Sequence, residues 1–570
     1  MKYLHRMIRY TEALGAMNWI LLLLLLLISA VFSFGVWAGP PLAGPPLAGP
    51  PTLHIYVGKG PSIDSKGTKL IPMPSLEMAI KKANDSNKRT VIHISEGEFS
   101  VGNGLAMGPD IELVGGHKIG DYDIRDPSKY ITKIVPLNPG AKEHMIKGFE
   151  GPNSFSGISF ESGKNNLSYS LFFERGGYVV KNCKFTSSGG GGIISLAGSV
   201  EVIDSHFVIS GPAKAFKGHN GKFFFRNNEV EGMVYADGAA ADGVPSQIHG
   251  NRITCGNDFC PVALEIKTPA IIYKNQIFGG NTSGESIAMR IQHNNGKISN
   301  SLVFKNLISG GAATDSTGIL VGTDNIQIFS NQIMGGAGKT RSIAVKVERS
   351  SAVFYNNLIH GGESEYHSYA IQIQSKGVLS RPSFFNNTIS GGKGKKETIS
   401  VQLLNSAAIF ENNIVFNDSK ARSCFYVHFD KQKKKVDYMT HLNISNNNLS
   451  QCDAVVEWAG EPPFNCSSNN DGDKNDRTCG VGDLEASKRS KQFSRNHQTK
   501  VNFVSLKGPD GKVKSLSDND WRLPASVNPK ISAGGVNGAN HGWPVKEDFS
   551  GHRRTGKGAH GWSLGAFEAD

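Results

Sequence analysis

The middle of the chain repeats a motif in which Asn-x-Ile or a close variant precedes Gly-Gly, and this repeat constrains the fold more than any other feature. The clearest copies begin at Asn275, Asn306 and Asn331, and the pattern continues at Asn357 and Asn387. Weaker copies place the equivalent position at Cys183, Ser205, Asn228, Asn251, Asn412 and Asn447. The intervals run from 22 to 35 residues, which is typical of a solenoid built from stacked repeats.

A second apolar alternation follows most of these positions from Asn251 onward, about fifteen residues later. Its apolar members are Val262, Leu264, Ile266, Ile287, Met289, Ile291, Ile343, Val345, Val347, Ile371, Ile373, Ile399, Val401 and Leu403. A helical solenoid would space apolar residues by three and four over ten or more positions, whereas here they alternate over five or six between turns. We therefore predict an all-β parallel β-helix with two strands per coil, the alternating residues pointing into its core.

The repeated asparagines are expected to stack at one corner of the coils. There they can hydrogen-bond along the axis as a ladder and adopt the left-handed backbone that a tight corner needs. This role is architectural.

The N-terminus predicts export. Lys2, Arg6 and Arg9 precede an uncharged run from Trp19 to Ala38. At about 1.5 Å per residue this run could just cross a bilayer core of about 30 Å, so both a cleaved signal peptide and an uncleaved anchor are open. We favour cleavage after Ala38, and in either case the rest of the chain is exported.

The chain has seven cysteines, an odd number that leaves one unpaired. An oxidising compartment would allow three disulfides, for which the expected partners are Cys255 with Cys260, Cys424 with Cys452, and Cys466 with Cys479. Cys183 is then a buried thiol. A zinc site is disfavoured because no C-x-x-C or histidine pair has the right spacing.

The stretch from Leu53 to Gly116 resembles the beginning of right-handed β-helix proteins of the pectate-lyase-like superfamily. It has a strand at 54–57, a short helix behind Ser75 as a plausible N-cap, and strands around 91–94 and 113–116. The helix carries one apolar stripe, made of Leu76, Ala79, Ile80 and Ala83. The resemblance implies a right-handed β-helix with a short N-terminal capping helix.

The end of the chain resembles the C-terminal module of β-helix repeat surface proteins. The matching segments are Trp521–Leu523, Asn528–Gly534, Asp548–Gly551 with Arg554, and Leu564–Glu568. The resemblance implies a C-terminal cap, in which Arg554, Asp548 and Glu568 would form a buried ion pair; a catalytic cluster is the alternative. The superfamily contains lyases, hydrolases, adhesins and autotransported passengers, so the fold does not give the function.

These features divide the chain into six segments. They are a signal peptide or anchor (1–38), a Pro/Gly/Ala-rich linker (39–52), an N-terminal cap with the first coils (53–150), the β-helix coils (151–450), a basic, cysteine-containing, loop-rich insertion (451–515) and a C-terminal cap module (516–570).

Long polar side chains on the outward positions of the second strand are the main candidates for a binding site. One exposed column should hold Glu265, Arg290, Lys346, Gln372 and Gln402, and the next should hold Lys267, Gln292, Glu348 and Gln374. At a coil spacing of about 4.8 Å they could hydrogen-bond successive hydroxyls or carboxylates of an extended glycan. The alternative is a solvated sheet face that is charged only to stay soluble.

Two weaker candidates remain. Asp237 and Asp242, with His249 following, are the nearest match to a hydrolase site, although such loop aspartates are more often turn formers. Asp471, Asp473 and Asn475 occupy the first, third and fifth ligand positions of a calcium loop, but positions six and twelve do not match. We expect no cofactor other than calcium at this loop.

The net charge of the chain does not identify a ligand. Lys and Arg exceed Asp and Glu by 12 (61 against 49), and between Lys488 and Lys514 there are eight basic residues and one acid. A basic, solvated segment explains this excess, so nucleic acid is not an expected partner.

We expect an exported surface or periplasmic protein that binds glycans or other extracellular macromolecules without catalysis. A polysaccharide lyase or glycosidase acting on an acidic polysaccharide is the first alternative, with Arg290 and Lys346, or Asp237 and Asp242, as its residues. A structural envelope spacer is the second. The expected partners are acidic polysaccharide or envelope components, and a membrane only through the N-terminal segment if it is uncleaved.

Overall fold

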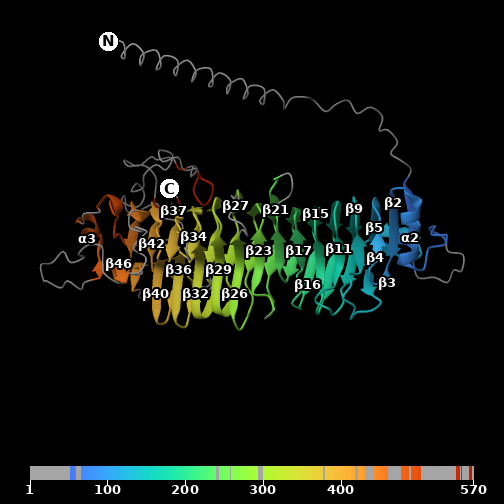
Figure 1. Ribbon diagram of the computed structural model, residues 1–570, viewed down its shortest axis with the longest axis horizontal. Coiled ribbons are helices and arrows are strands. Elements are labelled where there is room, and N and C mark those ends of the chain that lie inside the picture. The colour runs from blue at the N-terminus through green and yellow to red at the C-terminus, as the bar shows by residue number, and fades with distance from the viewer. Residues whose placement is uncertain are drawn as a thin grey trace, which may run out of the picture. The chain divides into compact units, whose positions relative to one another are not determined.

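The computed structural model describes residues 52–58, 66–238, 243–256, 259–292, 300–375, 379–417, 422–429, 441–459, 477–486, 490–501, 547–552, 554 and 564–567. The chain forms two units, Met1–Thr52 and Leu53–Asp570, and the second contains the described structure beyond Thr52. In it the chain winds into successive coils, each of which typically gives one short strand to each of three sheets, A, B and C (Figure 1). The predicted all-β parallel β-helix is confirmed.

The strands of one sheet pair in parallel from coil to coil. Sheet A contains β1 (Leu53–Val57), β2 (Thr90–Ser95), β5 (Ile111–Lys118), β9 (Asn153–Ser156), β12 (Gly177–Lys181), β15 (Gly198–Ile203), β18 (Gly221–Arg226), β21 (Ser246–His249), β24 (Ala270–Tyr273), β27 (Ser301–Phe304), β30 (Ile326–Phe329), β33 (Val353–Tyr355), β37 (Ser383–Phe385), β41 (Ile409–Glu411) and β44 (Asn443–Ser445). Sheet B contains β3 (Gly97–Val101), β7 (Thr132–Pro136), β10 (Ile158–Glu161), β13 (Lys184–Ser187), β16 (His206–Ile209), β19 (Glu229–Glu231), β22 (Arg252–Thr254), β25 (Gln276–Phe278), β28 (Leu307–Ser309), β31 (Gln332–Met334), β34 (Leu358–His360), β38 (Thr388–Ser390), β42 (Ile414–Phe416) and β45 (Asn448–Ser450).

Sheet C carries the longest strands. It contains β4 (Leu105–Met107), β8 (Ile146–Gly148), β11 (Tyr169–Phe173), β14 (Gly191–Ser195), β17 (Phe216–His219), β20 (Val234–Asp237), β23 (Val262–Lys267), β26 (Glu285–Gln292), β29 (Ala312–Gly322), β32 (Ala337–Glu348), β36 (His367–Gln374), β40 (Glu397–Leu404), β43 (Ser423–His428) and β46 (Ala454–Ala459), with β35 (Glu363–Ser364) and β39 (Lys393–Gly394) extending it. Two antiparallel strands join the sheets, β6 (Asp121–Arg125) beside β5 and β47 (Thr478–Cys479) beside β46.

The prediction of two strands per coil is wrong, because sheet A supplies a third. From β21 onward its strands have only three or four residues, as in β24, and end just before the corner asparagine. A strand of three or four residues presents only one or two side chains to the core, here Ile272 before Asn275, which is too short a run to be recognised as an alternation.

The predicted asparagine ladder is confirmed, with one shift and one addition. The backbone N–H and the Nδ2 of Asn275 both donate to Oδ1 of Asn306 at 3.0 Å, and Nδ2 also donates to the carbonyl of Ile248 at 2.8 Å. The rung assigned to Asn412 is Asn413, and Asn496 adds a rung that the sequence did not suggest. The rungs are Asn228, Asn251, Asn275, Asn306, Asn331, Asn357, Asn387, Asn413, Asn447 and Asn496.

The left-handed backbone lies one residue before the ladder, not at the ladder asparagines. Lys274 has φ 54°, Ser330 has φ 53° and Asn412 has φ 59°. Asn412 therefore supplies the turn and Asn413 the rung, which explains the shifted assignment in a pair of adjacent asparagines.

A second ladder fills the Gly-Gly corner. The Ser342 hydroxyl donates to the carbonyls of Gly336 at 3.0 Å and of Gly361 at 2.6 Å, and Ser316 and Ser368 make equivalent pairs of bonds. A Cβ at Gly335 would collide with the carbonyl oxygen of Gly361, so this close approach requires glycine.

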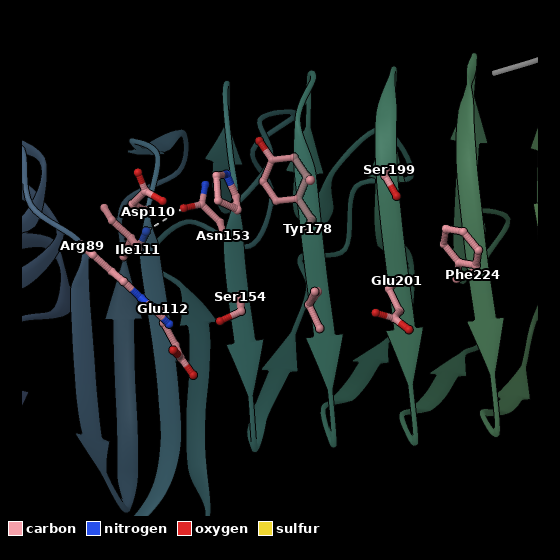
Figure 2. Close-up of a pocket in the computed structure, with 13 residues that line it drawn as sticks. Arg89, Asp110, Ile111, Glu112, Asn153, Ser154, Tyr178, Ser199, Glu201 and Phe224 are labelled. Atoms are coloured by element: carbon pink, nitrogen blue, oxygen red, sulfur yellow. Dashed lines mark hydrogen bonds between the residues drawn. The ribbon is translucent and has the colours of Figure 1, made fainter. Parts of the chain in front are cut away.

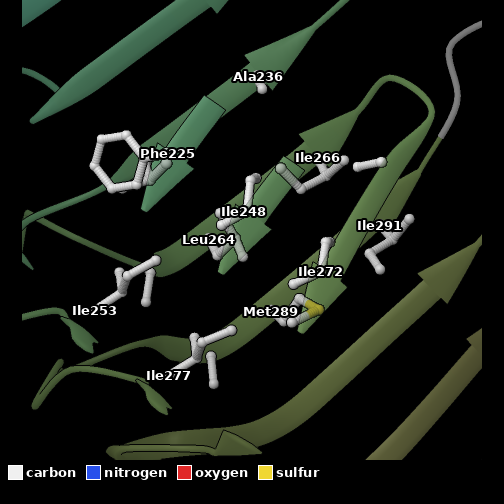
Figure 3. Packing of buried hydrophobic residues seen from close by; sticks show 14 of the residues in the cluster. Phe225, Ala236, Ile248, Ile253, Leu264, Ile266, Ile272, Ile277, Met289 and Ile291 are labelled. Carbon is white, nitrogen blue, oxygen red and sulfur yellow. The ribbon is translucent and has the colours of Figure 1, made fainter. Parts of the chain in front are cut away.

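Alternate side chains from all three sheets meet in one core (Figure 3). Leu264, Ile272, Ile277 and Met289 are fully buried there, and each such side chain contributes about 1.5–3 kcal/mol.

Four residues predicted to point into this core do not. Val262, Ile287, Ile343 and Ile399 are buried in two small clusters outside it. The reason is a break in the alternation of the strand. Two consecutive residues, Ala263 and Leu264 in β23, both point into the core, so Val262 before them points outward.

The helix α2 (Leu76–Ser86) confirms the prediction made from its stripe. The Ser75 hydroxyl accepts a hydrogen bond from the Met78 N–H at 3.4 Å, and Leu76, Ala79, Ile80 and Ala83 are buried in the main core. It lies beside the first coils (Figure 1).

The described parts of the last hundred residues occupy two places. The helix α3 (Val481–Ala486) and the 3-10 turn η2 (Ser490–Gln492) follow β47, and Leu484 and Phe493 join the main core. Residues 564–567 instead pack against sheet B, where the Gly565 N–H donates to the Asn412 carbonyl at 2.8 Å. Arg554 is buried and donates to Oδ1 of Asn356 at 2.8 Å, whereas Glu568 lies outside the described residues.

Two of the predicted disulfides form, Cys255–Cys260 and Cys424–Cys452, and Cys183 is a buried free thiol as predicted. Cys479 is also disulfide-bonded, while Cys466 lies outside the described residues. Disulfides are rare in cytosolic proteins, which indicates an exported protein. No helix within the described ranges is long and apolar enough to cross a membrane, and the run from Trp19 to Ala38 lies outside those ranges.

Three histidines form a chain across the first coils of sheet A. Nδ1 of His117 faces the Tyr122 carbonyl at 2.8 Å, which only accepts, so His117 carries its proton there. Its Nε2 therefore accepts from Nδ1 of His93 at 3.2 Å, and Nε2 of His93 accepts from Nδ1 of His54 at 3.0 Å. Burial and the neighbouring imidazoles lower the pKa of His93 to about 4, and burial lowers that of His117.

Replacing one ladder asparagine should destabilise the whole coil stack. Asn275→Ala leaves the buried Asn251 N–H without its acceptor and removes one donor from the Ile248 carbonyl, so we expect the free energy of unfolding to fall by about 3 kcal/mol. Gln276→Ala, which removes an exposed amide from the next position, is the matched control and should cost less than about 1 kcal/mol. Equal losses in urea unfolding would contradict the ladder's role.

The histidine chain predicts a loss of stability in acid. Between about pH 6.5 and about pH 4 the unfolded chain binds more protons than the folded chain, so the free energy of unfolding falls as the pH drops. His93→Phe should reduce this fall, measured as the change in unfolding midpoint from pH 6.5 to pH 4.5. This range lies between the ordinary pKa of histidine, about 6.5, and the pKa of His93, about 4. His206→Phe, on sheet B, is the control, and identical pH dependence in wild type and His93→Phe would contradict the prediction.

Candidate functional site

The outer face of sheet C brings the predicted polar columns together. Glu265 lies beside Arg290, and Lys346 lies beside Gln372, which lies beside Gln402. In the second column Glu348 lies beside Gln374. The register of these candidates is therefore as the alternation predicted, but the expectation of an exposed first column is wrong for Glu265, Gln372 and Gln402, which are buried among their neighbours.

The first column also holds residues that the sequence did not suggest. Leu320 separates Arg290 from Lys346, Tyr235 precedes Glu265, and Tyr426 and Glu457 follow Gln402. Leu320 was missed because its coil was not among the recognised alternations. We refer to these two columns together as the sheet C face.

The polar side chains of the sheet C face contact one another. Oε1 of Glu265 lies 3.3 Å from Nζ of Lys267 and 3.9 Å from Nη1 of Arg290. Nζ of Lys346 lies 3.3 Å from Oε1 of Glu348. Nε2 of Gln372 donates to Oε1 of Gln402 at 2.6 Å. The Glu265 and Lys346 side chains are only 11% and 19% exposed, so the network is held in place before any ligand arrives.

A third row of charges borders the face on the side of the Gly-Gly corner. Nε of Arg341 donates to Asp315 at 2.9 Å, His367 lies 3.0 Å from Glu397, and Arg422 contacts Glu397 at 3.0 Å and also Glu457. Sequence reasoning missed this row, although its members alternate with the apolar residues of β29, β32, β36 and β40.

The end of the face nearest the N-terminus holds a compact group around Tyr235. The Tyr235 hydroxyl donates to Oδ2 of Asp237 at 2.6 Å, and Nδ1 of His219 lies 3.3 Å from Oδ1. Burial alone would raise the pKa of Asp237, but the contacts with Tyr235 and His219 outweigh burial and hold it below its usual value. Burial and the hydrogen bond to Asp237 raise the pKa of Tyr235.

The structure separates two members of the predicted group of Asp237, Asp242 and His249, because Asp237 lies on sheet C. His249 lies on sheet A, where its ring stacks on Tyr273 at 4.6 Å, and Asp242 lies outside the described residues. The loop between Asp237 and His249 connects two sheets, so nearness in sequence does not bring the side chains together. His219, from the neighbouring coil, takes the place predicted for His249.

The predicted calcium ligands Asp471, Asp473 and Asn475 also lie outside the described residues, so calcium binding there stays a prediction. Within the described ranges, no cluster of three or more His, Cys, Asp or Glu side chains could hold a metal ion.

A hollow of about 680 Å³ lies on the outer face of sheet A (Figure 2). Glu112, Ser154, Val179 and Glu201 follow one another in register along it. The two glutamates are thus three coils, or about 14 Å, apart, which is too far for the paired carboxylates of a glycosidase.

A second hollow, of about 600 Å³, lies at the edge of sheet C beyond the Gly-Gly corner. Small side chains such as Ala312 and Ala337 line it, and Lys339, Lys393 and Glu363 surround it.

Sheet A also carries a row of aromatic rings on its outer side. Tyr273, Phe304, Phe329 and Tyr355 stack face to face at 4.8–5.1 Å between ring centres. Their faces cover one another, so the row does not offer a flat aromatic platform on which sugars could stack.

No protein-family model and no curated protein matches the chain. Among solved structures, bacteriophage CBA120 tailspike protein 3 is similar at 14% identity and a TM-score of 0.35, over 71% of this chain and 61% of that chain. The periplasmic alginate epimerase AlgG is similar at 12% identity and a TM-score of 0.32, over 57% of this chain and 76% of that one. The Streptococcus pneumoniae surface protein and adhesin PfbA is similar at 12% identity and a TM-score of 0.27, over 62% and 89%.

Proposed function

We propose that this chain is an exported surface or periplasmic protein that binds an extended glycan along the sheet C face, without catalysis. The observation that carries the proposal is the register of the two columns, which places long polar side chains on neighbouring coils, with one interruption at Leu320. The disulfides support an extracellular setting.

The chemistry of the face suits a polymer of hydroxyls and carboxylates. Arg290 and Lys346 are donors, Glu265 and Glu348 are acceptors, and Gln372 and Gln402 are both. Their mutual contacts reduce the entropy that is lost when they bind a ligand, because the side chains are already ordered. A face kept charged only for solubility would not need this order.

Removing the two cations of the first column should abolish retention on a glycan array. Each donor lost from a charge-assisted hydrogen bond is worth about 1.5–3 kcal/mol, so we expect Arg290→Ala with Lys346→Ala to lower affinity at least tenfold. Surface plasmon resonance with the retained glycan measures this change in affinity.

Arg252→Ala with Lys184→Ala is the matched control, since it removes one arginine and one lysine from sheet B. Its affinity should stay within about twofold of wild type, well under the tenfold that 1.4 kcal/mol represents. Retention unchanged in the Arg290 and Lys346 variant would remove the sheet C face as the site. Absence of any retention by the wild-type chain would favour the envelope spacer.

One observation favours an enzyme as the second candidate. Glu265 and Asp237 are diagonal neighbours on adjacent parallel strands, which lie about 4.8 Å apart, so both carboxylates lie on the outer face within reach of one sugar. The low pKa of Asp237 suits a base but not an acid.

Incubation with a panel of acidic polysaccharides tests the enzyme directly. We expect no ultraviolet absorbance from unsaturated uronides and no new reducing ends. Product formation that disappears in Asp237→Asn would replace the binding proposal with a lyase or glycosidase.

A further inference from the structure

Two partly buried lysines at the N-terminal end of the sheet C face lack an acidic partner. Lys214 precedes β17 and Lys217 lies on it, and neither forms an ion pair with any residue in the described part of the chain. Lys267, Arg290 and Lys346 on the same face are all paired. Partly buried, uncompensated cations are costly, which marks them as candidates for an anionic ligand.

The lysines converge on Tyr235. Lys217 lies beside Tyr235 in register, Nζ of Lys214 is 5.2 Å from the centre of the Tyr235 ring, and Nζ of Lys267 is 5.3 Å from it. Lys214 comes from the coil before Tyr235 and Lys267 from the coil after it. Two ammonium groups thus lie over one phenol ring, and Lys217 occupies the neighbouring register position.

The nearby carboxylates are already engaged. Asp237 contacts Tyr235 and His219, and Glu265 contacts Lys267 and Arg290. Burial first, and then repulsion by Lys217, lower the pKa of Lys214, although attraction by Glu265 acts against them.

We propose that Lys214 and Lys217 bind the anionic substituent, a carboxylate or a sulfate, of a sugar held at Tyr235. This inference rests on the proposed function, because it names the chemical class of glycan that the sheet C face takes. The remaining columns then hold the hydroxyls of the following sugars.

Calorimetry with three polymers tests the proposal on the full chain. Polygalacturonate carries carboxylates, dextran sulfate carries sulfates and dextran is neutral. We expect wild type to bind at least one anionic polymer at least tenfold more tightly than dextran, and the tighter of the two identifies the group. Lys214→Met with Lys217→Met should lose at least tenfold affinity for it and leave binding to dextran unchanged.

Lys184→Met with Lys222→Met makes the same change of charge on sheets B and A and is the matched control. Equal losses in the two double variants would mean diffuse attraction and would overturn the site. Binding that survives Lys214→Met with Lys217→Met but is lost in Arg290→Ala with Lys346→Ala would overturn this inference alone. A wild-type chain that binds none of the three polymers would overturn the proposed function as well.

Discussion

The structure depends on satisfying the buried polar groups at one corner of every coil. Each interior ladder asparagine accepts from the backbone of the coil before it and donates to carbonyls around it, as Asn331 does through Nδ2 to Val303 at 2.9 Å and to Phe329 at 2.9 Å. An unsatisfied buried donor or acceptor costs about 1–3 kcal/mol, so a coil cannot slip without losing several bonds at once. The ladder therefore fixes the register of the strands that follow it.

That register produces the sheet C face. Side chains alternate across a strand, so a fixed corner decides which residues of sheet C point outward and which outward residues become neighbours. Arg290 meets Glu265, and Gln372 meets Gln402, because their asparagine corners are stacked. The sheet C face is in this sense a consequence of the buried amides at another corner of the coil.

Much of this architecture could be predicted from the sequence because it is periodic. The asparagine corners, the long strands of sheet C and the stripe of α2 each repeat a recognisable pattern within a few residues. The place of Leu320 in the first column was not predicted because its coil was not among the recognised alternations. Asn496 was not predicted as a rung because it comes 49 residues after the preceding rung. From β21 onward the strands of sheet A have only three or four residues, too few to show an alternation.

The group around Tyr235 could not be predicted, since it depends on contacts between coils. His219, Tyr235 and Lys267 come from three successive strands, and no local pattern links them. Asp237 and His249 were paired instead because they are close in sequence, yet the intervening loop carries them to different sheets. The alternation within each strand predicts the polar columns. The contacts between side chains of neighbouring coils follow only from the register of the stacked strands.

Hydroxyl-radical footprinting of the full chain with and without a bound glycan tests the central claim most directly. Tyr235 and Tyr426 lie in the first column of the sheet C face, whereas Tyr273 lies on the outer side of sheet A. We expect the glycan to protect Tyr235 and Tyr426 from oxidation and to leave the oxidation of Tyr273 unchanged. Protection of Tyr273 alone, or of none of the three while the glycan is bound, would contradict it.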